Sequence, residues 1–197
     1  MTKKTPLNAI ILAAGKGTRM NSSLPKVVHE VAGKPMLLYV VDAVKKIEAR
    51  CFVVVGHQAE RVRECVSDMP VQCVEQLEQL GTGHAVQQVI PLLATDAPSC
   101  TVVLAGDCPL IQPETLQQLM TYHADTQAAA TVLTTHMPDP TGYGRILRGD
   151  DNQVRGIKEQ KECSEEETLI TEINSGIYIF DTQLMCTHIT KLGSANK

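Results

Sequence analysis

Tryptophan is absent from this sequence, and four tyrosines and two phenylalanines are its only aromatic residues, 3% of 197 positions. Its core must therefore be aliphatic, and the 43% of hydrophobic residues are enough to build one. Aliphatic cores suit parallel sheets whose two faces are covered by helices. A chain of this length favours one domain over two small ones, so we expect a single domain over residues 1–197.

The sequence also lacks a basic excess and any long apolar run, and its formal net charge is −4. A general nucleic-acid binder needs basic residues to release counterions, so we expect no nucleic-acid partner and only a local cationic site. The run Ala9–Ala14 is too short for a signal peptide, and no stretch approaches a membrane span. We therefore expect no membrane partner and a cytoplasmic location.

No C-x-x-C pair occurs among the seven cysteines, which argues against a zinc or dithiol motif. We expect free, buried thiols of the kind found in a reducing cytoplasm. The cysteines are Cys51, Cys65, Cys73, Cys100, Cys108, Cys163 and Cys186.

Apolar, β-rich runs alternate with segments of helical period through the first 135 residues. This alternation predicts repeated βαβ units, and so a mostly parallel sheet with helices on both faces. Strands are expected at Asn8–Ala14, Cys51–Val55, Val71–Glu75, Cys100–Ala105 and Ala128–Thr135, and helices at Pro35–Ile47, Gln58–Val66, His84–Ala94 and Glu114–His123.

After about residue 140 the rhythm changes to strands without full helices between them. Strands are expected at Tyr143–Leu147, Val154–Lys158 and Ile173–Phe180, with a hairpin turn at Arg148–Asn152. The acidic run Glu162–Glu167 is expected to be a solvated loop. This part of the chain is predicted to add smaller strands beside the main sheet.

A loop rich in glycine and cations follows the first predicted strand. Gly15 and Gly17 allow a tight turn, and Lys16, Arg19 and Lys26 bring three positive charges close together. Backbone N–H groups and cations at such a turn form a cradle for an anion. The loop matches neither the Walker A pattern nor G-x-G-x-x-G, and a plain surface turn is the alternative.

A carboxylate, Asp107, follows the strand that ends at Ala105. Ligands of open parallel sheets bind beyond the carboxyl ends of the strands, so this side chain is expected near the cradle. Magnesium commonly takes one or two carboxylates together with phosphate oxygens and water. Asp107 is therefore a candidate Mg²⁺ ligand, and an ordinary loop aspartate is the alternative.

An amide, Gln76, follows the third strand and precedes the turn Gly81–Gly83. A glutamine amide offers a donor and an acceptor, which suits the edge of a uracil. The glycines permit close approach of the backbone before a helix begins. A surface turn is again the alternative.

Together the three features supply an anion cradle, a metal ligand and a base reader at one end of a sheet. No Ser/His/Asp set is apparent. A sugar phosphate nucleophile needs no general base, because its second pKa is about 6 and it is largely ionised near pH 7. The combination fits phosphoryl or nucleotidyl transfer, in which positioning and charge neutralisation do the catalysis.

Five motifs in order resemble the sugar-1-phosphate nucleotidyltransferases, and among them the uridyltransferase domain of the bifunctional N-acetylglucosamine-1-phosphate uridyltransferases. The resemblance runs from about residue 8 to the end. It implies a Rossmann-like three-layer α/β/α nucleotide-diphospho-sugar transferase fold with a mostly parallel mixed sheet. The motifs are Leu12–Met20 with Leu24–Lys26, Gln79–Ala85, Gly106-Asp107, Pro140–Arg145 and Glu172–Ile177.

The resemblance implies a role for each matching residue. Arg19 and Lys26 would hold the nucleotide phosphates, and Asp107 would bind Mg²⁺. Gly144, Glu159 and Asn174, by type alone ordinary strand and turn residues, would hold the N-acetylglucosamine moiety. The remaining substrate-binding residues are Leu12, Ala13, Ala14, Gly15, Gln76, Gly81, Thr82, Ala105 and Gly106.

Two departures from the family pattern stand out. Ala105 takes the place of a tyrosine common in close relatives, which would open one wall of the site. The sequence ends at Lys197, before the family's second metal ligand, an asparagine, and before its β-helix acetyltransferase domain. We therefore expect a chain truncated at its C-terminus, with a trimer only if the parent protein carries that domain.

The predicted reaction is transfer of UMP from UTP to N-acetylglucosamine 1-phosphate, giving UDP-N-acetylglucosamine, a peptidoglycan and lipopolysaccharide precursor, and pyrophosphate. A thymidylyltransferase or a molybdenum-cofactor nucleotidyltransferase is the enzymatic alternative, although the last two motifs argue against it. A nucleotide-binding module inactivated by truncation is the alternative without catalysis.

Overall fold

The computed structural model describes residues 6–17, 20, 22–93 and 99–191. The chain divides into two compact units. Unit 1 comprises Met1–Thr131 and Tyr178–Lys197, and unit 2 comprises Val132–Ile177.

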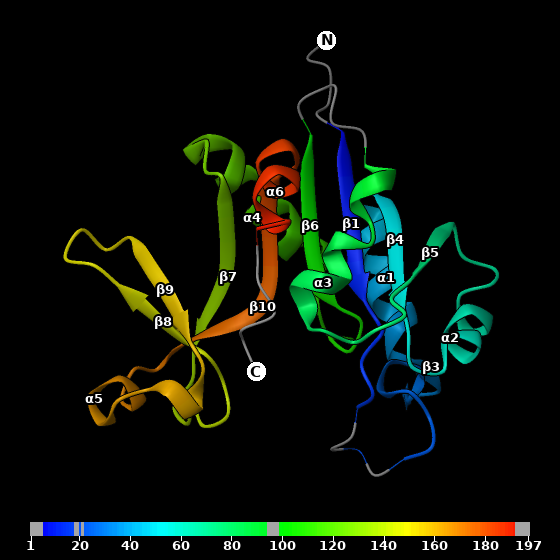
Figure 1. The fold of residues 1–197 in the computed structure, drawn as a ribbon, viewed down its shortest axis with the longest axis horizontal. Helices are drawn as coiled ribbons and strands as arrows, with labels where there is room; N and C mark the ends of the chain where they lie inside the picture. The colour runs from blue at the N-terminus through cyan, green and yellow to red at the C-terminus, as the bar shows by residue number, and fades with distance from the viewer. Residues whose placement is uncertain (1–5, 18–19, 21, 94–98, 192–197) are drawn as a thin grey trace. The chain divides into compact units, whose positions relative to one another are not determined.

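A sheet with four parallel strands forms the centre of unit 1 (Figure 1). Its order is β5 (Val71–Glu75), β4 (Arg50–Val55), β1 (Leu7–Leu12) and β6 (Cys100–Ala105). The last four residues of β10 (Glu172–Asp181) pair antiparallel with β6. The mostly parallel sheet predicted from the strand–helix alternation is confirmed for unit 1, and the antiparallel β10 makes the sheet mixed.

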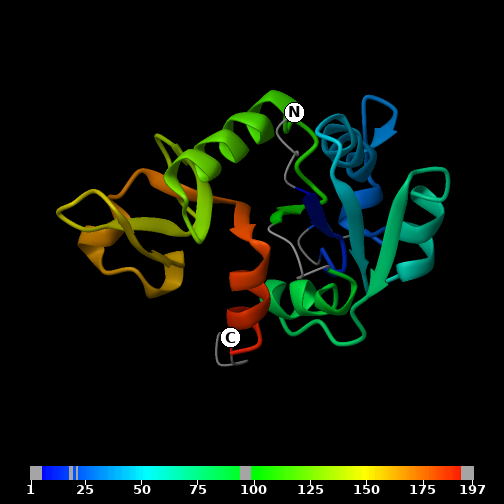
Figure 2. The ribbon, with the colours of Figure 1, turned by 90° about the horizontal axis from the view of Figure 1, so that it is seen from above.

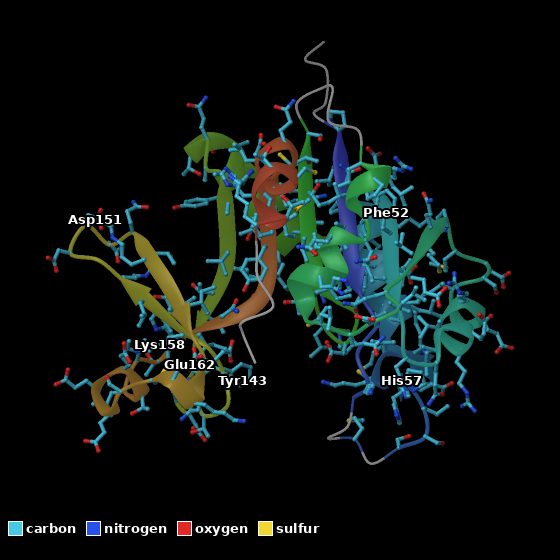
Figure 3. The ribbon with its side chains drawn as sticks, in the orientation of Figure 1. Phe52, His57, Tyr143, Asp151, Lys158 and Glu162 are labelled. Carbon is cyan, nitrogen blue, oxygen red and sulfur yellow. The ribbon has the colours of Figure 1, made fainter. Side chains whose placement is uncertain are left out.

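The central strands of unit 1 are buried on both faces. Five of the six residues of β4 and of β1 are buried, and Phe52, labelled in Figure 3, is fully buried. Ile10 and Val103 pack in the same cluster as Phe52. Near-continuous apolar strands of this kind are typical of parallel sheets covered by helices.

Helices cover both faces of the unit 1 sheet. On one face α1 (Met36–Lys46) contacts α4 (Pro113–Thr126), and on the other α3 (Thr82–Gln87) contacts α6 (Thr182–Ile189), as Figure 2 shows. Helix α1 buries an apolar stripe and carries Lys45 and Lys46 in its last turn, where the helix dipole favours cations. The smaller elements are α2 (Ala59–Cys65), η2 (Lys26–Val28), η3 (Ile90–Leu92) and the pair β2 (Glu30–Val31) and β3 (Lys34–Pro35).

The prediction of a single helix at His84–Ala94 is wrong. The structure has α3, which begins two residues earlier, followed by the 3-10 turn η3 with Pro91 in its first turn. Proline lacks an N–H and its ring clashes with the preceding turn, so an α-helix does not run through it. Ala94 lies outside the described residues. Helix α6, which the sequence did not indicate, follows β10 and is capped by Asp181.

Unit 2 is built on antiparallel strands. β8 (Arg145–Arg148) pairs with β9 (Val154–Lys158), and also with β10 where Arg145 faces Ile173. β7 (Ala130–His136) pairs with β10. The hairpin predicted between β8 and β9 is confirmed, and Asn152 in its turn adopts a positive φ of 61°.

The acidic run of unit 2 is more ordered than the predicted loop. It forms the 3-10 turn η4 (Gln160–Glu162) and the one-turn helix α5 (Glu165–Thr168). Ser164 and Glu167 make a capping box at the start of α5. Glu167 also accepts a hydrogen bond from Nζ of Lys158 at 2.6 Å. Figure 3 labels Lys158, together with Glu162 of the same segment. The loop prediction is wrong here because a cap and an ion pair order the segment.

The cysteines are all free, as expected, but only Cys51 is buried and the other six are half-buried. Burial raises the pKa of Cys51 to about 12. No helix within the described ranges has the length and apolarity needed to cross a membrane.

Candidate active site

The carboxyl ends of the parallel strands meet at one edge of the unit 1 sheet, the edge where His57 is labelled in Figure 3. Backbone hydrogen bonds hold the loops that leave these strands. Gly106 N–H donates to the carbonyl of Leu12 at 2.9 Å, and Gln76 N–H donates to Val55 at 2.8 Å. The loops surround a cavity of about 580 Å³. It is lined by Leu12, Ala13, Ala14, Gly15, Gly17, Met20, Lys26, Val27, Gln76, Gln79, Gly81, Thr82, Ala85, Ala105 and Asp107.

The glycine-rich loop turns back against η2. Gly17 has a φ of 56°, and a Cβ at this position would lie 2.9 Å from the Cβ of Lys26. A side chain would therefore be strained and would displace the lysine. Arg19, the predicted second phosphate contact, lies outside the described residues.

Lys26 and Asp107 form an ion pair inside the cavity, with 2.5 Å between Nζ and Oδ2. The two side chains are 42% and 24% exposed, so both remain accessible to a ligand. Within the described residues no group of three or more His, Cys, Asp and Glu could hold a metal. Asp107 is therefore the one carboxylate that the described lining of the cavity offers to a metal.

Gln76 is almost fully buried at 3% exposure, yet its side chain lines the cavity. Its Nε2 donates to the carbonyl of Gly81 at 3.1 Å, and its backbone carbonyl accepts from Nε2 of Gln79 at 3.0 Å. Gly81 has a φ of 111°, a region that disfavours any residue with a side chain. The bond to Gly81 and the contact of Nε2 with Nδ1 of His84 at 3.0 Å hold the amide in place at the cavity wall.

Among the described residues of unit 1 that were predicted to bind substrate, Gly106 alone does not line the cavity. A Cβ there would lie 3.1 Å from Val27, 3.2 Å from Leu37 and 3.3 Å from Ile11. The absence of a side chain thus serves close packing beneath the site. Ala105, in contrast, lines the cavity with its small side chain.

The three residues predicted to hold the sugar lie together in unit 2. Asn174 N–H donates to the carbonyl of Gly144 at 2.9 Å. A Cβ at Gly144 would lie 3.2 Å from Oε1 of Glu159. Glu159 is exposed and Asn174 half-buried, so their polar groups can reach a ligand. Strands β8 and β10 therefore bring residues 30 positions apart in the sequence to one place.

A polar network supports this cluster, and sequence reasoning missed it. Arg145 is 1% exposed and donates to the carbonyl of Tyr143 and, at 2.7 Å, to Gln160. Glu172 accepts from Arg148 at 2.7 and 2.6 Å. The hydrogen bonds from Arg148 lower the pKa of Glu172 to about 2. Arg145 and Arg148 lie on the short strand β8, and strand alternation gave no sign that Arg145 and Glu172 are buried.

Several cavity residues were also missed. Met20, Val27 and Ala85 add apolar surface, and Gln79 adds an amide near Gln76. Their place beside predicted site residues could have indicated them, because Val27 follows Lys26 directly and Ala85 lies one helical turn after Thr82. Their residue types gave no indication that they line a cavity.

The sequence model of the MobA-like NTP transferase domain matches residues 9–167. The chain is 50% identical over 191 residues to the bifunctional protein GlmU of Lactococcus lactis subsp. cremoris, covering 95% of this chain and 41% of that protein. It is 51% identical over 189 residues to the bifunctional protein GlmU of Exiguobacterium sibiricum, covering 95% and 42%. The chain thus spans about two fifths of the length of these curated relatives.

Solved structures share the fold at lower identity. HddC from Yersinia pseudotuberculosis gives a TM-score of 0.71 at 24% identity, covering 91% of this chain and 79% of that one. A putative glucose-1-phosphate thymidylyltransferase from Bacillus anthracis gives 0.72 at 19% identity, covering 95% and 76%. These likenesses show the α/β fold with its mixed sheet.

Proposed function

Because the chain belongs to the MobA-like NTP transferase domain family, we propose that it is a nucleotidyltransferase that transfers UMP from UTP to N-acetylglucosamine 1-phosphate. The products are UDP-N-acetylglucosamine and pyrophosphate. The observation that carries the proposal is the unit 1 cavity, which places a cation, a carboxylate and a buried amide at the carboxyl ends of parallel strands. Identity of about 50% to the GlmU proteins favours this substrate pair over the other sugar and cofactor transferases.

The chemistry requires charge control more than proton transfer. An oxygen of the sugar phosphate attacks the α-phosphorus of UTP, and the bond from that phosphorus to the pyrophosphate oxygen breaks. Lys26 offsets the negative charge that develops on the phosphates, with Arg19 as its proposed partner. The backbone of Leu12–Gly15 orients the triphosphate against this cation.

A divalent metal fits the site through Asp107, with substrate phosphates and water as its other ligands. We propose Mg²⁺, which would supply charge neutralisation at the phosphates. In this structure Asp107 forms an ion pair with Lys26. Substrate binding must break this pair, so that Lys26 contacts the phosphates and Asp107 contacts the metal. Asp107 keeps its second oxygen available, because the ion pair joins Nζ to Oδ2.

Unit 2 would recognise the acceptor sugar. Glu159 and Asn174 offer a carboxylate and an amide, groups that bind sugar hydroxyls and an N-acetyl group through hydrogen bonds. Gly144 leaves the space between them open. The proposal concerns the uridyl transfer alone, because this chain matches only about two fifths of the length of the curated relatives.

The test measures pyrophosphate release from UTP and N-acetylglucosamine 1-phosphate with added Mg²⁺. Lys26→Ala and Asp107→Ala should each lower kcat/KM by on the order of 10²–10³ while the circular dichroism spectrum stays unchanged. Lys46→Ala, an exposed lysine at the end of α1, is the matched control. Wild-type activity in either site variant would overturn the mechanism.

A panel of nucleotides and sugar phosphates separates this function from the other transferases. A preference for dTTP or for glucose 1-phosphate would refute the proposed substrates. Binding of UTP by calorimetry without any pyrophosphate release would identify a nucleotide-binding module instead.

A further inference from the structure

We propose that His84, together with the carbonyl of Gly81, fixes the orientation of the Gln76 amide and so makes the cavity select a base that donates a hydrogen bond, as uracil does, over one that accepts, as cytosine does. The inference rests on the proposed function and deepens it. His84 is a positioning residue in this account, because its ring acts through Gln76.

The direction of the Gln76 amide follows from its neighbours. Its Nε2 lies 3.1 Å from the carbonyl oxygen of Gly81 and 3.0 Å from Nδ1 of His84. A carbonyl oxygen can only accept, so the NH₂ end of the amide must face Gly81. The second hydrogen of the same NH₂ group then points to His84. Both amide hydrogens are used, and no described residue donates to Oε1.

The tautomer of His84 follows in turn. Its Nδ1 accepts from Gln76, so the ring hydrogen sits on Nε2. Gln88 places its own Nε2 3.1 Å from that ring nitrogen and donates to the carbonyl of His84 at 3.1 Å. A neutral imidazole accepts at one nitrogen only. Gln76 is buried and Gln88 half-exposed, so Gln88 can exchange this contact for water and Gln76 retains its own.

The consequence is a polarised recognition group. Gln76 presents only its acceptor oxygen, Oε1, to the cavity. This oxygen can accept a hydrogen bond from the N3–H of uracil. Cytosine has an unprotonated N3, whose lone pair would face that oxygen. Without His84 only the hydrogen bond to Gly81 would hold the amide, so its NH₂ group could turn more easily toward an acceptor. Gln76 would then tolerate either base, and discrimination would fall.

The experiment compares kcat/KM for UTP and CTP in the full chain. His84→Ala and His84→Leu each remove the acceptor, and both should reduce the UTP/CTP ratio by on the order of tenfold to a hundredfold. His84→Asn places an oxygen near the position of Nδ1 and should restore most of the ratio. Gln88→Ala, which leaves the Gln76–His84 contact intact, should keep it.

Two results would overturn the inference. One is an unchanged UTP/CTP ratio in a folded His84→Ala or His84→Leu protein, and the other is an equal loss in His84→Asn. If the wild-type chain releases no pyrophosphate, the proposed function has failed. The role of His84 is then decided by calorimetry, from the UTP/CTP affinity ratio of the same variants.

Discussion

Glu172 in unit 2 is a buried carboxylate whose charge should stabilise the protein measurably. Its side chain is 10% exposed, accepts two hydrogen bonds from Arg148 and a third from Thr134 at 2.7 Å. Against the opposing effect of burial, these contacts lower its pKa from 4.5 to about 2, with those from Arg148 acting most strongly. We predict that Glu172→Gln destabilises the chain at neutral pH.

The size of the effect follows from the linkage between pKa and stability. A tenfold change in proton affinity corresponds to about 1.36 kcal/mol, so the fall in pKa is worth at most about 3 kcal/mol. The side chain of Arg148 is 35% exposed, and solvent screening reduces the expected loss to roughly 2 kcal/mol. Because the folded-state pKa is depressed, the stabilisation is complete above pH 4.5 and disappears as the pH falls toward 2.

The assay is urea unfolding followed by circular dichroism between pH 7 and pH 2, since no tryptophan is available as a probe. The wild-type and Glu172→Gln curves should be separated at pH 7, approach each other below pH 4.5 and coincide near pH 2. Glu166→Gln, an exposed glutamate on α5, is the matched control and should show no such separation. A Glu172→Gln difference that is absent, or independent of pH, would refute the reasoning.

Three further substitutions test the site and the fold. Gly144→Ala would crowd the Glu159 carboxylate, so KM for the sugar phosphate should rise about tenfold or more while KM for UTP stays unchanged. Gly17→Ala combines a positive φ with a clash against Lys26, so UTP binding by calorimetry should weaken with little change in the sugar site. Asp181→Ala removes the cap of α6 and should cost about 1 kcal/mol in urea unfolding.

The order of strands and helices in unit 1 could be predicted from local pattern, because buried parallel strands are uninterrupted apolar runs. Val71–Glu75 and Cys100–Ala105 were predicted with their observed bounds. The cavity residues after those strands follow from a general rule of open parallel sheets, and Gln76 and Asp107 do lie in the lining. Their chemical roles stay predictions.

Most of the features that were not predicted depend on contacts between residues far apart in the sequence. The helix α5 was missed because its capping box, Ser164 and Glu167, lies inside an acidic run that resembles a solvated loop, while its ion-pair partner Lys158 lies outside the run. The buried Arg145 was missed because its partners include Gln160, on another segment. The short helix α3 was overestimated because apolar residues continue past Pro91 with a helical period. The hydrophobic period of a segment shows neither its contacts with distant residues nor the point at which a proline ends a helix.

The insertion of unit 2 between the two segments of unit 1 has a consequence during synthesis. One edge of β6 pairs with β1, but its other edge pairs with Tyr178–Asp181, which emerge from the ribosome about seventy residues later. At roughly 5–20 residues per second, that edge stays unpaired for about 4 to 15 s. An exposed, apolar strand edge is a template for pairing with other chains. The nascent protein therefore passes through an interval in which a chaperone, or fast translation, would limit its aggregation.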